Sequence, residues 1–367
     1  MRVALLTYST RPRGGVVHTL HLAESLAEVG VDVHVWTLGR GGDTTFFRPV
    51  DPRVQVHAVP FPDPDEDVGA RILRSIDVLA EAFAAGPGYD VVHAQDCISA
   101  NAALRVGRCL RTVHHLDSFT TPALVACHER AVREPDGLVC VSAAVAAEVE
   151  AEYGRTPAVI PNGVAAARFE SGARDVAGRA RWQDVLGRYV LALGGIEPRK
   201  GSLDLLSAMA TLRARRSDLA DVRLVYAGGE TLFDYRDYRA RFEALSAEVG
   251  VVPEILGPVD DDVLPSLLAQ AEVLPFLSTK EGFGLAALEA LAAGTAVVAR
   301  DLPVLREVLG GTVTYGHDVE TFADALERAL DAPPPVGPGR DLARGYSWQA
   351  AATAHLDVYR RLSDRPR

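Results

Sequence analysis

Short apolar runs that alternate with longer helical patterns are the feature that most constrains the fold of this chain. Between most of the runs lie patterns such as 16–29, whose apolar residues fall on one rough helical face. Strands are expected in the first part of the chain at 3–8, 32–38, 54–59, 90–94, 110–116, 137–142 and 158–162. Alternation of this kind is typical of a parallel, doubly wound α/β sheet.

A second series of strands and helices follows a break in this pattern. From 164 to 188 the chain is rich in Ala, Gly and Arg with weak periodicity, which predicts a linker, placed at 171–188. Strands are expected again at 189–195, 222–229, 252–257, 272–278 and 295–300, before a Pro/Gly block at 332–339 and a last helical segment. We therefore predict two Rossmann-like, doubly wound domains that face a cleft, with ligands beyond the carboxyl ends of the strands.

Charge and hydropathy limit the classes of function that this chain can have. Its formal charge of -11 argues against nucleic acid as a partner, because binding to phosphates requires a positive face. No apolar run approaches the roughly 20 residues of a membrane-spanning helix. The first apolar run, Val3–Leu6, is too short for the core of a signal peptide. We predict a cytoplasmic protein without a transmembrane segment; peripheral work at the inner membrane face is left open.

Cysteine and lysine usage adds two further constraints. The 4 cysteines lie far apart with no CxxC spacing, which argues against a zinc site or a disulfide framework. Of the 38 basic residues only Lys200 and Lys280 are lysines, so charge is generally written as arginine here. Where lysine persists, a compact ammonium group could be required, although chance also explains so small a number. Both lysines stand beside glycine-bearing stretches of the kind that approach phosphates.

The stretch FLSTKEGFGLAALEAL, residues 276–291, places two glutamates and two glycines at the entrance of an apolar helix that Gly294 ends. The first-turn amides of such a helix form an anion site. If every residue between them were helical, Glu281 and Glu289 would be about 12 Å apart along the axis. That is too far for a glycosidase pair, which needs roughly 5–9.5 Å, but it suits a nucleotide sugar, which has hydroxyls at both ends and a diphosphate between. The alternative is two solvated glutamates.

The stretch GGIEPRKG carries the second candidate site. Gly194 and Gly195 follow an expected strand, and Arg199 and Lys200 lead into an expected helix. Either cation could neutralise a diphosphate leaving group, and the isolated lysine is the better candidate. The stretch is neither a P-loop nor a GxGxxG fingerprint, so by itself an ordinary polar turn explains it better.

Two neighbouring histidines, His114 and His115, end an expected strand of the first domain. Strand alternation turns one of them inward, where its N–H could bind a sugar hydroxyl and its ring could stabilise developing charge. A buried histidine bonded to a carbonyl explains the spacing equally well.

Three weaker candidates for acceptor binding lie in other loops of the first domain. Gly14 and Gly15 begin the first helix and could bring a polar acceptor close to the backbone. Asp96 follows another strand and could face the cleft. The alternative for each is ordinary loop polarity.

Patterns typical of metal or covalent chemistry do not hold up in this chain. Asp63–Asp65 and Asp260–Asp262 match the aspartate spacing of metal-dependent sugar transferases, but the first lies in a proline-flanked loop and the second reads as helix capping. No nucleophile elbow GxSxG is present. We predict no catalytic metal and no covalent serine or cysteine chemistry.

Taken together, these motifs resemble the retaining glycosyltransferases of family 4, which have the GT-B fold. The resemblance spans nearly the whole chain and is most specific in its C-terminal half. It is carried by EGFGLAALE (281–289, the E-x7-E signature), ARDLPVLREVL, GGIEPRKG, VCVSAAVAAEV, VIPNGVAAARF, GGVVHTLHLAESLAEVGVDVHV and GYSWQAAATAHLDVYRRL.

The resemblance implies roles for the candidate residues. Glu289 would hold the ribose, Glu281 the hydroxyls of the transferred sugar, and Lys200 with the backbone at 283–285 the diphosphate. His114 matches the family's histidine near the transferred sugar, so the implied catalytic residues are His114, Glu281 and Lys200. The implied donor-binding residues are Gly195, Arg199, Lys200, Glu281, Gly282, Phe283, Gly284, Leu285 and Glu289.

The resemblance also implies an organisation and a reaction. Residues 1–170 would bind a small-molecule or lipid-linked acceptor, and 189–345 a UDP- or GDP-linked sugar as substrate, with no cofactor. The terminal helix, 346–367, would pack back onto the first domain. Transfer would retain the anomeric configuration by same-face attack.

One departure from the family weakens the comparison, and two alternatives follow. Many members have arginine where this chain has Gly195, and Arg199 could substitute for it. The alternatives are a GT-B nucleotide-sugar epimerase and a non-catalytic nucleotide-sugar-binding protein.

Overall fold

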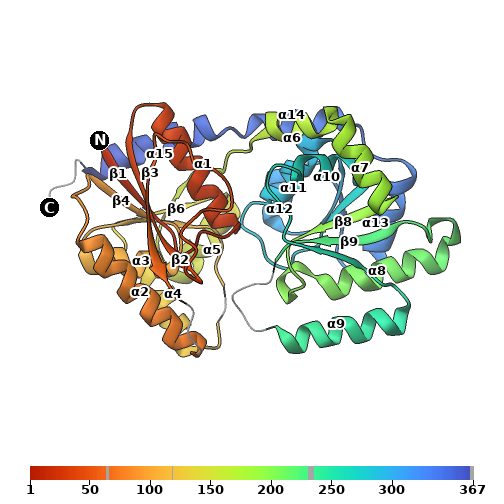
Figure 1. The fold of residues 1–367 in the computed structure, drawn as a ribbon, viewed down its shortest axis with the longest axis horizontal. Helices are drawn as coiled ribbons and strands as arrows, with labels where there is room; N and C mark the ends of the chain where they lie inside the picture. Colours follow the sequence, from red (N-terminus) through yellow and green to blue (C-terminus); the bar gives the residue numbers. More distant parts are fainter. Residues whose placement is uncertain (63–65, 118, 230–234, 364–367) are drawn as a thin grey trace. The chain divides into compact units, whose positions relative to one another are not determined.

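The computed structural model describes residues 1–62, 66–117, 119–229 and 235–363. These form two compact units, here called unit 1 (Met1–Gly163 with Ser347–Arg367) and unit 2 (Val164–Tyr346). Each unit is a parallel sheet with helices on both of its faces, as Figure 1 shows. The prediction of two Rossmann-like, doubly wound domains is therefore confirmed.

Unit 1 is built on a seven-stranded sheet in the order β3-β2-β1-β4-β5-β6-β7. All of its strand pairs are parallel; Val3, for example, stands opposite Val33 on one side and Val91 on the other. Its elements are β1 (Arg2–Leu6), α1 (Gly14–Glu28), β2 (Asp32–Arg40), β3 (Gln55–Phe61), α2 (Val68–Ala84), β4 (Val91–Ala94), α3 (Cys97–Val106), β5 (Leu110–Val113), α4 (Pro122–Arg133), β6 (Gly137–Cys140), α5 (Ala143–Tyr153), β7 (Ala158–Val159) and α15 (Trp348–Ser363).

Unit 2 is built on a six-stranded parallel sheet in the order β10-β9-β8-β11-β12-β13. Its first elements are α6 (Ala166–Arg174), α7 (Val176–Leu186), β8 (Tyr189–Leu193), η1 (Pro198–Lys200), α8 (Ser202–Arg215), η2 (Ser217–Leu219), β9 (Arg223–Ala227) and α9 (Arg236–Val249). The others are β10 (Glu254–Gly257), α10 (Leu264–Gln270), β11 (Val273–Phe276), α11 (Leu285–Ala293), β12 (Ala296–Arg300), α12 (Pro303–Leu309), β13 (Thr314–Gly316), α13 (Val319–Asp331) and α14 (Val336–Gly345).

The central strands are apolar along their whole length because helices cover both faces of each sheet. Residues Val3–Leu6 of β1 and Val273–Leu274 of β11 have no exposed surface. Such continuous apolar runs explain why the strands could be recognised in the sequence, since a strand buried on both faces has no polar side to interrupt the run.

Each sheet has a point at which the strand order reverses. In unit 1 this point lies between β1 and β4, and in unit 2 between β8 and β11. Loops that leave neighbouring strands there diverge, and in open parallel sheets ligands bind in the crevice that this leaves. The loops after β8 and β11 are those that carry Lys200 and Glu281.

The structure differs from the expected linker. Residues 171–188, and 164–170 before them, belong to unit 2 and form α6 and α7. The helical periodicity of α7 is weak because only Leu186 among its residues is buried. An N-cap stabilises the start of α7 instead: the Asp175 side chain accepts a hydrogen bond from the Gly178 N–H.

The C-terminal part of the chain holds elements that were not expected as well as one that was. Strand β13 adds an edge to the second sheet, and α14 begins inside the Pro/Gly block, where Pro338 lies in the first turn and needs no amide partner. The expected terminal helix is α15, which packs against α1 and β4 within unit 1 (Figure 1). Among the described residues, no helix combines the length and the apolarity needed to cross a membrane.

Candidate functional site

The entrance of α11 is shaped by Gly284, the residue that precedes the helix. Gly284 has φ +97°, and a Cβ built on it would lie 3.1 Å from Leu305, so a larger residue would be strained there. No side chain in the described part of the chain caps α11. The free amides of its first turn and its dipole therefore favour an anion at this end. Gly294 ends the helix in the left-handed conformation, as the sequence predicted.

Beside this entrance, Glu281 forms ion pairs with both predicted phosphate-binding cations. Its Oε1 atom lies 3.0 Å from Lys200 Nζ and 3.1 Å from Arg199 Nη1. Arg199 is held further by the carbonyl of Lys280, and its own carbonyl accepts a hydrogen bond from the Thr279 amide at 2.8 Å. The loops after β8 and β11 are thus joined through one carboxylate.

Burial and charge act on Glu281 in opposite directions. Burial raises the pKa of its carboxyl group. The charges of Lys200 and Arg199 lower this pKa by a larger amount, and the resulting pKa is about 2. Glu281 is therefore ionised at every physiological pH. Its side chain is only 13% exposed, so these ion pairs are much less screened than pairs on the surface.

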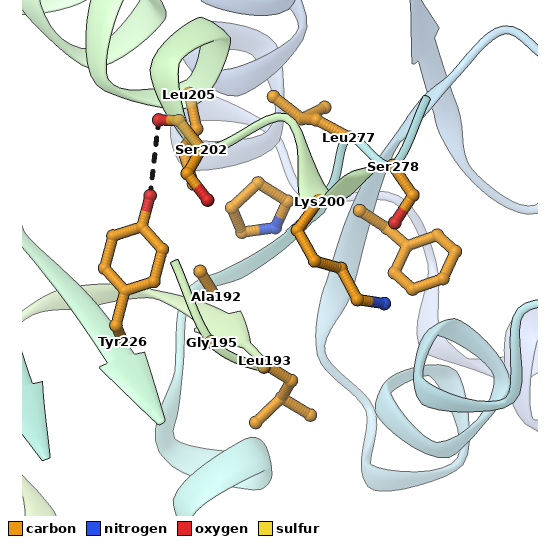
Figure 2. A pocket seen from close by; sticks show the side chains of 12 residues that line it. Ala192, Leu193, Gly195, Lys200, Ser202, Leu205, Tyr226, Leu277 and Ser278 are labelled. Carbon is orange, nitrogen blue, oxygen red and sulfur yellow. Dashed lines mark hydrogen bonds between the residues drawn. The ribbon is translucent and has the colours of Figure 1, made fainter. Parts of the chain in front are cut away.

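A small pocket opens at the reversal point of the second sheet, between the ends of β8 and β11. Gly195, Lys200 and Ser278 are among the residues that line it, and Figure 2 shows the Lys200 side chain reaching into it. The Lys200 ammonium group stands over the ring of Phe276, 5.3 Å from its centroid. Lys200 passes close to Gly194, where a Cβ would lie 3.4 Å from Lys200 Cε.

Glu289, on the second turn of α11, has a pKa that is shifted in the opposite direction from that of Glu281. Burial raises its pKa to about 7; Arg168 of α6 lowers the pKa and Asp261 raises it. Arg168 and Asp261 form an ion pair with each other at 2.9 Å, so the arginine is shared. Among the described residues no hydrogen bond reaches the Glu289 carboxylate, which leaves its oxygens available to a ligand.

In unit 1, the structure places His114 just beyond the end of β5. Its ring lies 4.8 Å from that of His18, and a Cβ on Gly15 would lie 3.5 Å from its Nε2. This Nε2 is buried and has no hydrogen-bond partner among the described residues. Burial, aided by His115 and Arg111, lowers the pKa of His114 to about 3, so the ring is neutral. The neighbouring His115 pairs with Asp117 at 3.0 Å.

His114 belongs to a group of buried imidazoles that the sequence did not reveal. His18 contacts His355 of α15 at a centroid distance of 6.1 Å, and His355 contacts His93 of β4 at 5.5 Å. His93 bonds the hydroxyls of Tyr359 and Thr112 at 2.8 and 2.7 Å. Burial lowers the pKa of each of these histidines. All are therefore neutral hydrogen-bonding groups, not cations, at neutral pH.

Asp96 has a structural role, whereas no packing contact among the described residues requires a glycine at position 14. The Asp96 carboxylate accepts hydrogen bonds from the Ser99 amide at 2.8 Å, which caps α3, and from the Tyr8 amide at 3.0 Å, which ties the loop after β1 to that helix. Burial raises the pKa of Asp96 despite these bonds. A Cβ on Gly14 would meet nothing within 4 Å. Acceptor binding by these residues stays a prediction.

Sequence reasoning missed Arg168 and misread Asp261. Arg168 lies at the end of the expected first domain, 1–170, and no local signal marks it as a neighbour of Glu289. Asp260–Asp262 was interpreted as helix capping, but that interpretation is wrong, because α10 begins after Val263 without a side-chain cap. The pair Asp63–Asp65 lies outside the described residues. Within them, no group of three or more His, Cys, Asp and Glu residues is arranged to hold a metal ion.

The chain is similar to known proteins in both its sequence and its fold. The model for Glycosyltransferase Family 4 matches residues 12–168, and that for Glycosyl transferases group 1 matches residues 184–339. The chain is 30% identical to D-inositol 3-phosphate glycosyltransferase of Pseudarthrobacter chlorophenolicus, over 99% of this chain and 96% of that protein.

Two solved structures share the fold over almost the whole chain. One is sucrose-phosphate synthase of Thermosynechococcus elongatus, with 20% identity, a TM-score of 0.79 and 98% of each chain covered. The other is HepE of Anabaena in complex with UDP-glucose, with 16% identity, a TM-score of 0.72, and 98% of this chain and 100% of that chain covered.

Proposed function

Since the chain belongs to the GT-B glycosyltransferases of family 4, we propose that it is a retaining, metal-independent enzyme that uses a nucleotide-sugar donor. The observation that carries this proposal is the convergence of Arg199 and Lys200 on the entrance of α11. The two cations and the first-turn amides of the helix together offer the charge that a diphosphate requires.

The proposed donor site uses both glutamates of the E-x7-E signature. The Glu289 carboxylate, which has no other hydrogen bond among the described residues, accepts hydrogen bonds from the ribose hydroxyls. Glu281 accepts hydrogen bonds from hydroxyls of the transferred sugar. Arg199 stands four residues after Gly195 and supplies the second cation that the family has at the position of that glycine. HepE, which shares the fold, was solved with UDP-glucose, which makes UDP-sugars the first donors to test.

In the proposed reaction, the acceptor hydroxyl oxygen attacks the anomeric carbon on the face from which the diphosphate leaves. The bond between that carbon and the phosphate oxygen breaks, and its electron pair passes to the diphosphate. The acceptor proton is transferred to a phosphate oxygen, so no protein base is required. Lys200 and Arg199 stabilise the negative charge as it develops on the leaving group, which is the role that a metal ion plays in other transferases.

His114 positions the sugar in this proposal. A neutral imidazole with a pKa of about 3 can donate or accept one hydrogen bond to a hydroxyl, and its Nε2 is otherwise unpaired among the described residues. The relative in Pseudarthrobacter chlorophenolicus is named for a phosphorylated inositol, so phosphorylated polyols belong in the acceptor panel with simple sugars and lipid-linked sugars.

A thermal-shift screen against UDP, GDP, ADP and dTDP tests the donor site first, because a ligand that binds the folded state raises the melting temperature by mass action. We expect one nucleoside diphosphate to stand out. The matching sugar nucleotides are then incubated with the acceptor panel in the presence and absence of EDTA, and the product's anomeric configuration is read by NMR.

The outcomes separate the parts of the proposal. Transfer with retention that EDTA leaves unchanged supports it. An inverted product or loss of activity in EDTA contradicts the mechanism, and no response to any nucleotide contradicts the donor site. An epimerised donor without an acceptor would identify an epimerase.

A further inference from the structure

The residue proposed to hold the donor's sugar is bonded to the two cations proposed to hold the donor's diphosphate. A single oxygen of Glu281 accepts from Lys200 Nζ at 3.0 Å and from Arg199 Nη1 at 3.1 Å. Glu197, which is 8% exposed, lies 3.5 Å from the other end of the Arg199 guanidinium group. The charges of the two cations are thus balanced by two carboxylates of the same unit.

We infer that Glu281 discriminates between the nucleotide-sugar donor and the nucleoside diphosphate product, by competing with the diphosphate for Lys200 and Arg199. This inference rests on the proposed function. A carboxylate and a phosphate oxygen are equivalent acceptors for an ammonium or guanidinium group, so the two anions compete for the same N–H donors.

The competition affects the donor and the product differently. When the donor binds, the phosphates take the cations, and the sugar's hydroxyls give the Glu281 carboxylate new hydrogen bonds. When the sugar has been transferred, the diphosphate alone offers Glu281 no replacement. A buried carboxylate without a partner is costly, so Glu281 returns to the cations and weakens the hold on the product. The same residue thereby favours donor binding and product release.

In the conformation of the site, this exchange requires only movements of side chains. Lys200 already stands over Phe276 in the pocket, and the Arg199 backbone is fixed by the Thr279 amide. Only the side chains of Lys200, Arg199 and Glu281 need to change their bonds. The backbone of the loops after β8 and β11 can stay in place.

Isothermal titration of the wild-type chain and of Glu281→Gln with UDP or GDP, and with the matching sugar nucleotide, tests the inference. Glutamine keeps the size of the side chain and its carbonyl acceptor but removes the charge. We expect Glu281→Gln to bind the nucleoside diphosphate about fivefold to tenfold more tightly, the effect of removing one competing carboxylate charge. We expect the ratio of product affinity to donor affinity to rise by at least that factor.

A matched control removes a carboxylate charge elsewhere in unit 2. Asp221→Asn eliminates a carboxylate that is 61% exposed and pairs with Arg188, and it should leave both affinities within about twofold of wild type because the charge is screened. Glu281→Ala serves as the second variant if the glutamine variant unfolds, and the same tightening toward the diphosphate is expected.

The measured affinities distinguish failure of the inference from failure of the proposed function. Equal or weaker diphosphate binding in both Glu281 variants, with normal binding in the wild type, overturns the inference and leaves the donor site intact. Tightening of the same size in Asp221→Asn also overturns it, because the effect is then general electrostatics. If the wild type binds no nucleoside diphosphate, the proposed function fails, and the inference fails with it.

Discussion

The two units share one architecture, but the candidate site of unit 1 is made of neutral side chains and that of unit 2 of charged ones. Unit 1 gathers neutral imidazoles, with His114 at the end of β5 and His18, His93 and His355 packed behind it. Unit 2 gathers ions around the ends of β8 and β11. The comparison shows that a doubly wound sheet fixes where a site lies but not its chemistry, which comes from the side chains of the loops.

The neutral groups of unit 1 and the charged groups of unit 2 suit different parts of the proposed substrates. Neutral hydrogen-bonding groups suit hydroxyls, which carry no charge, whereas a diphosphate requires cations. Burial produced both states: it makes an imidazole neutral when no anion is close, and it strengthens an ion pair when cation and anion are together.

The largest expected effect comes from removing the Lys200 charge. Lys200→Ala should lower turnover by about 100-fold to 1000-fold, the usual effect of losing one donor that stabilises a developing anion. Arg199→Ala should have a smaller effect, because only Lys200 lines the pocket. Steady-state kinetics with a saturating donor measures both variants. Lys280→Ala, the other lysine of the chain, is the control and should stay within about twofold of wild type. A loss as large in the control would assign the effect to general charge.

The next effect concerns donor affinity. Glu289→Ala should weaken donor binding by about tenfold or more, because two ribose hydroxyls lose the carboxyl group that accepts their hydrogen bonds. Calorimetry with the sugar nucleotide measures it, and Glu320→Ala on the surface of α13 is the control. Unchanged affinity in Glu289→Ala would remove Glu289 from the donor site.

A smaller effect, on rate alone, is expected in unit 1. His114→Ala should slow transfer by about tenfold through the loss of one hydrogen bond to the sugar, while donor affinity measured by calorimetry stays the same. His115→Ala is the neighbouring control, because the His115 side chain pairs with Asp117 at 3.0 Å and has no role in the proposed contact with the sugar. The pH profile of the wild type should show no inflection near 6.5 from His114, since its pKa is about 3. Equal transfer rates in His114→Ala and wild type would contradict its positioning role.

The smallest expected effect is on stability, because the two units should respond to acid in opposite directions. The pKa values of the buried histidines lie below the ordinary 6.5, so the folded unit 1 binds fewer protons than the unfolded chain and loses stability as the pH falls below 6.5. The pKa of Glu289, raised from 4.5 to about 7, has the opposite sign, so unit 2 gains stability as the pH falls from 7 toward 4.5.

Hydrogen exchange read by mass spectrometry can measure the two units separately. At about pH 5.5 each buried imidazole should cost unit 1 about 1 kcal/mol, and Glu289 should return about 1–2 kcal/mol to unit 2, once intrinsic exchange rates are corrected for pH. Peptides from β5 and α15 should therefore lose protection while those from α11 gain it. In Glu289→Gln the gain in α11 should disappear. A parallel loss in both units would show that the charge states do not differ as described.

Much of the fold could be predicted from the sequence, and the misses have a common cause. The strands at 3–8 and 272–278 were recognised because burial on both faces leaves an uninterrupted apolar run. Helix α7 was taken for a linker because its surface is mostly exposed, so a cap at Asp175 and packing against α10 stabilise it in place of an apolar stripe. Strand β13, three residues long at a sheet edge, is too short for any periodicity to show.

The candidate site divides in the same way. Glu281, Glu289 and Lys200 could be singled out because glycines, a helix start and isolated charges mark them locally. The partners of Glu289 could not, since Arg168 and Asp261 are 121 and 28 positions away along the chain. Nor could the sequence place His355 beside His18, because that contact depends on the terminal helix packing onto α1.

By itself the sequence determined the alternation of the central strands with helices, the glycine-lined entrance of α11 and the identity of the charged groups near it. These are local properties, set by burial periodicity and by the backbone freedom of glycine. Only the tertiary structure decided that Glu281 is fully ionised while Glu289, eight positions later, has a pKa near 7. The reason is physical: a carboxyl group's charge state depends on which cations lie within a few ångströms and how much water remains, and both are set by residues distant in the chain.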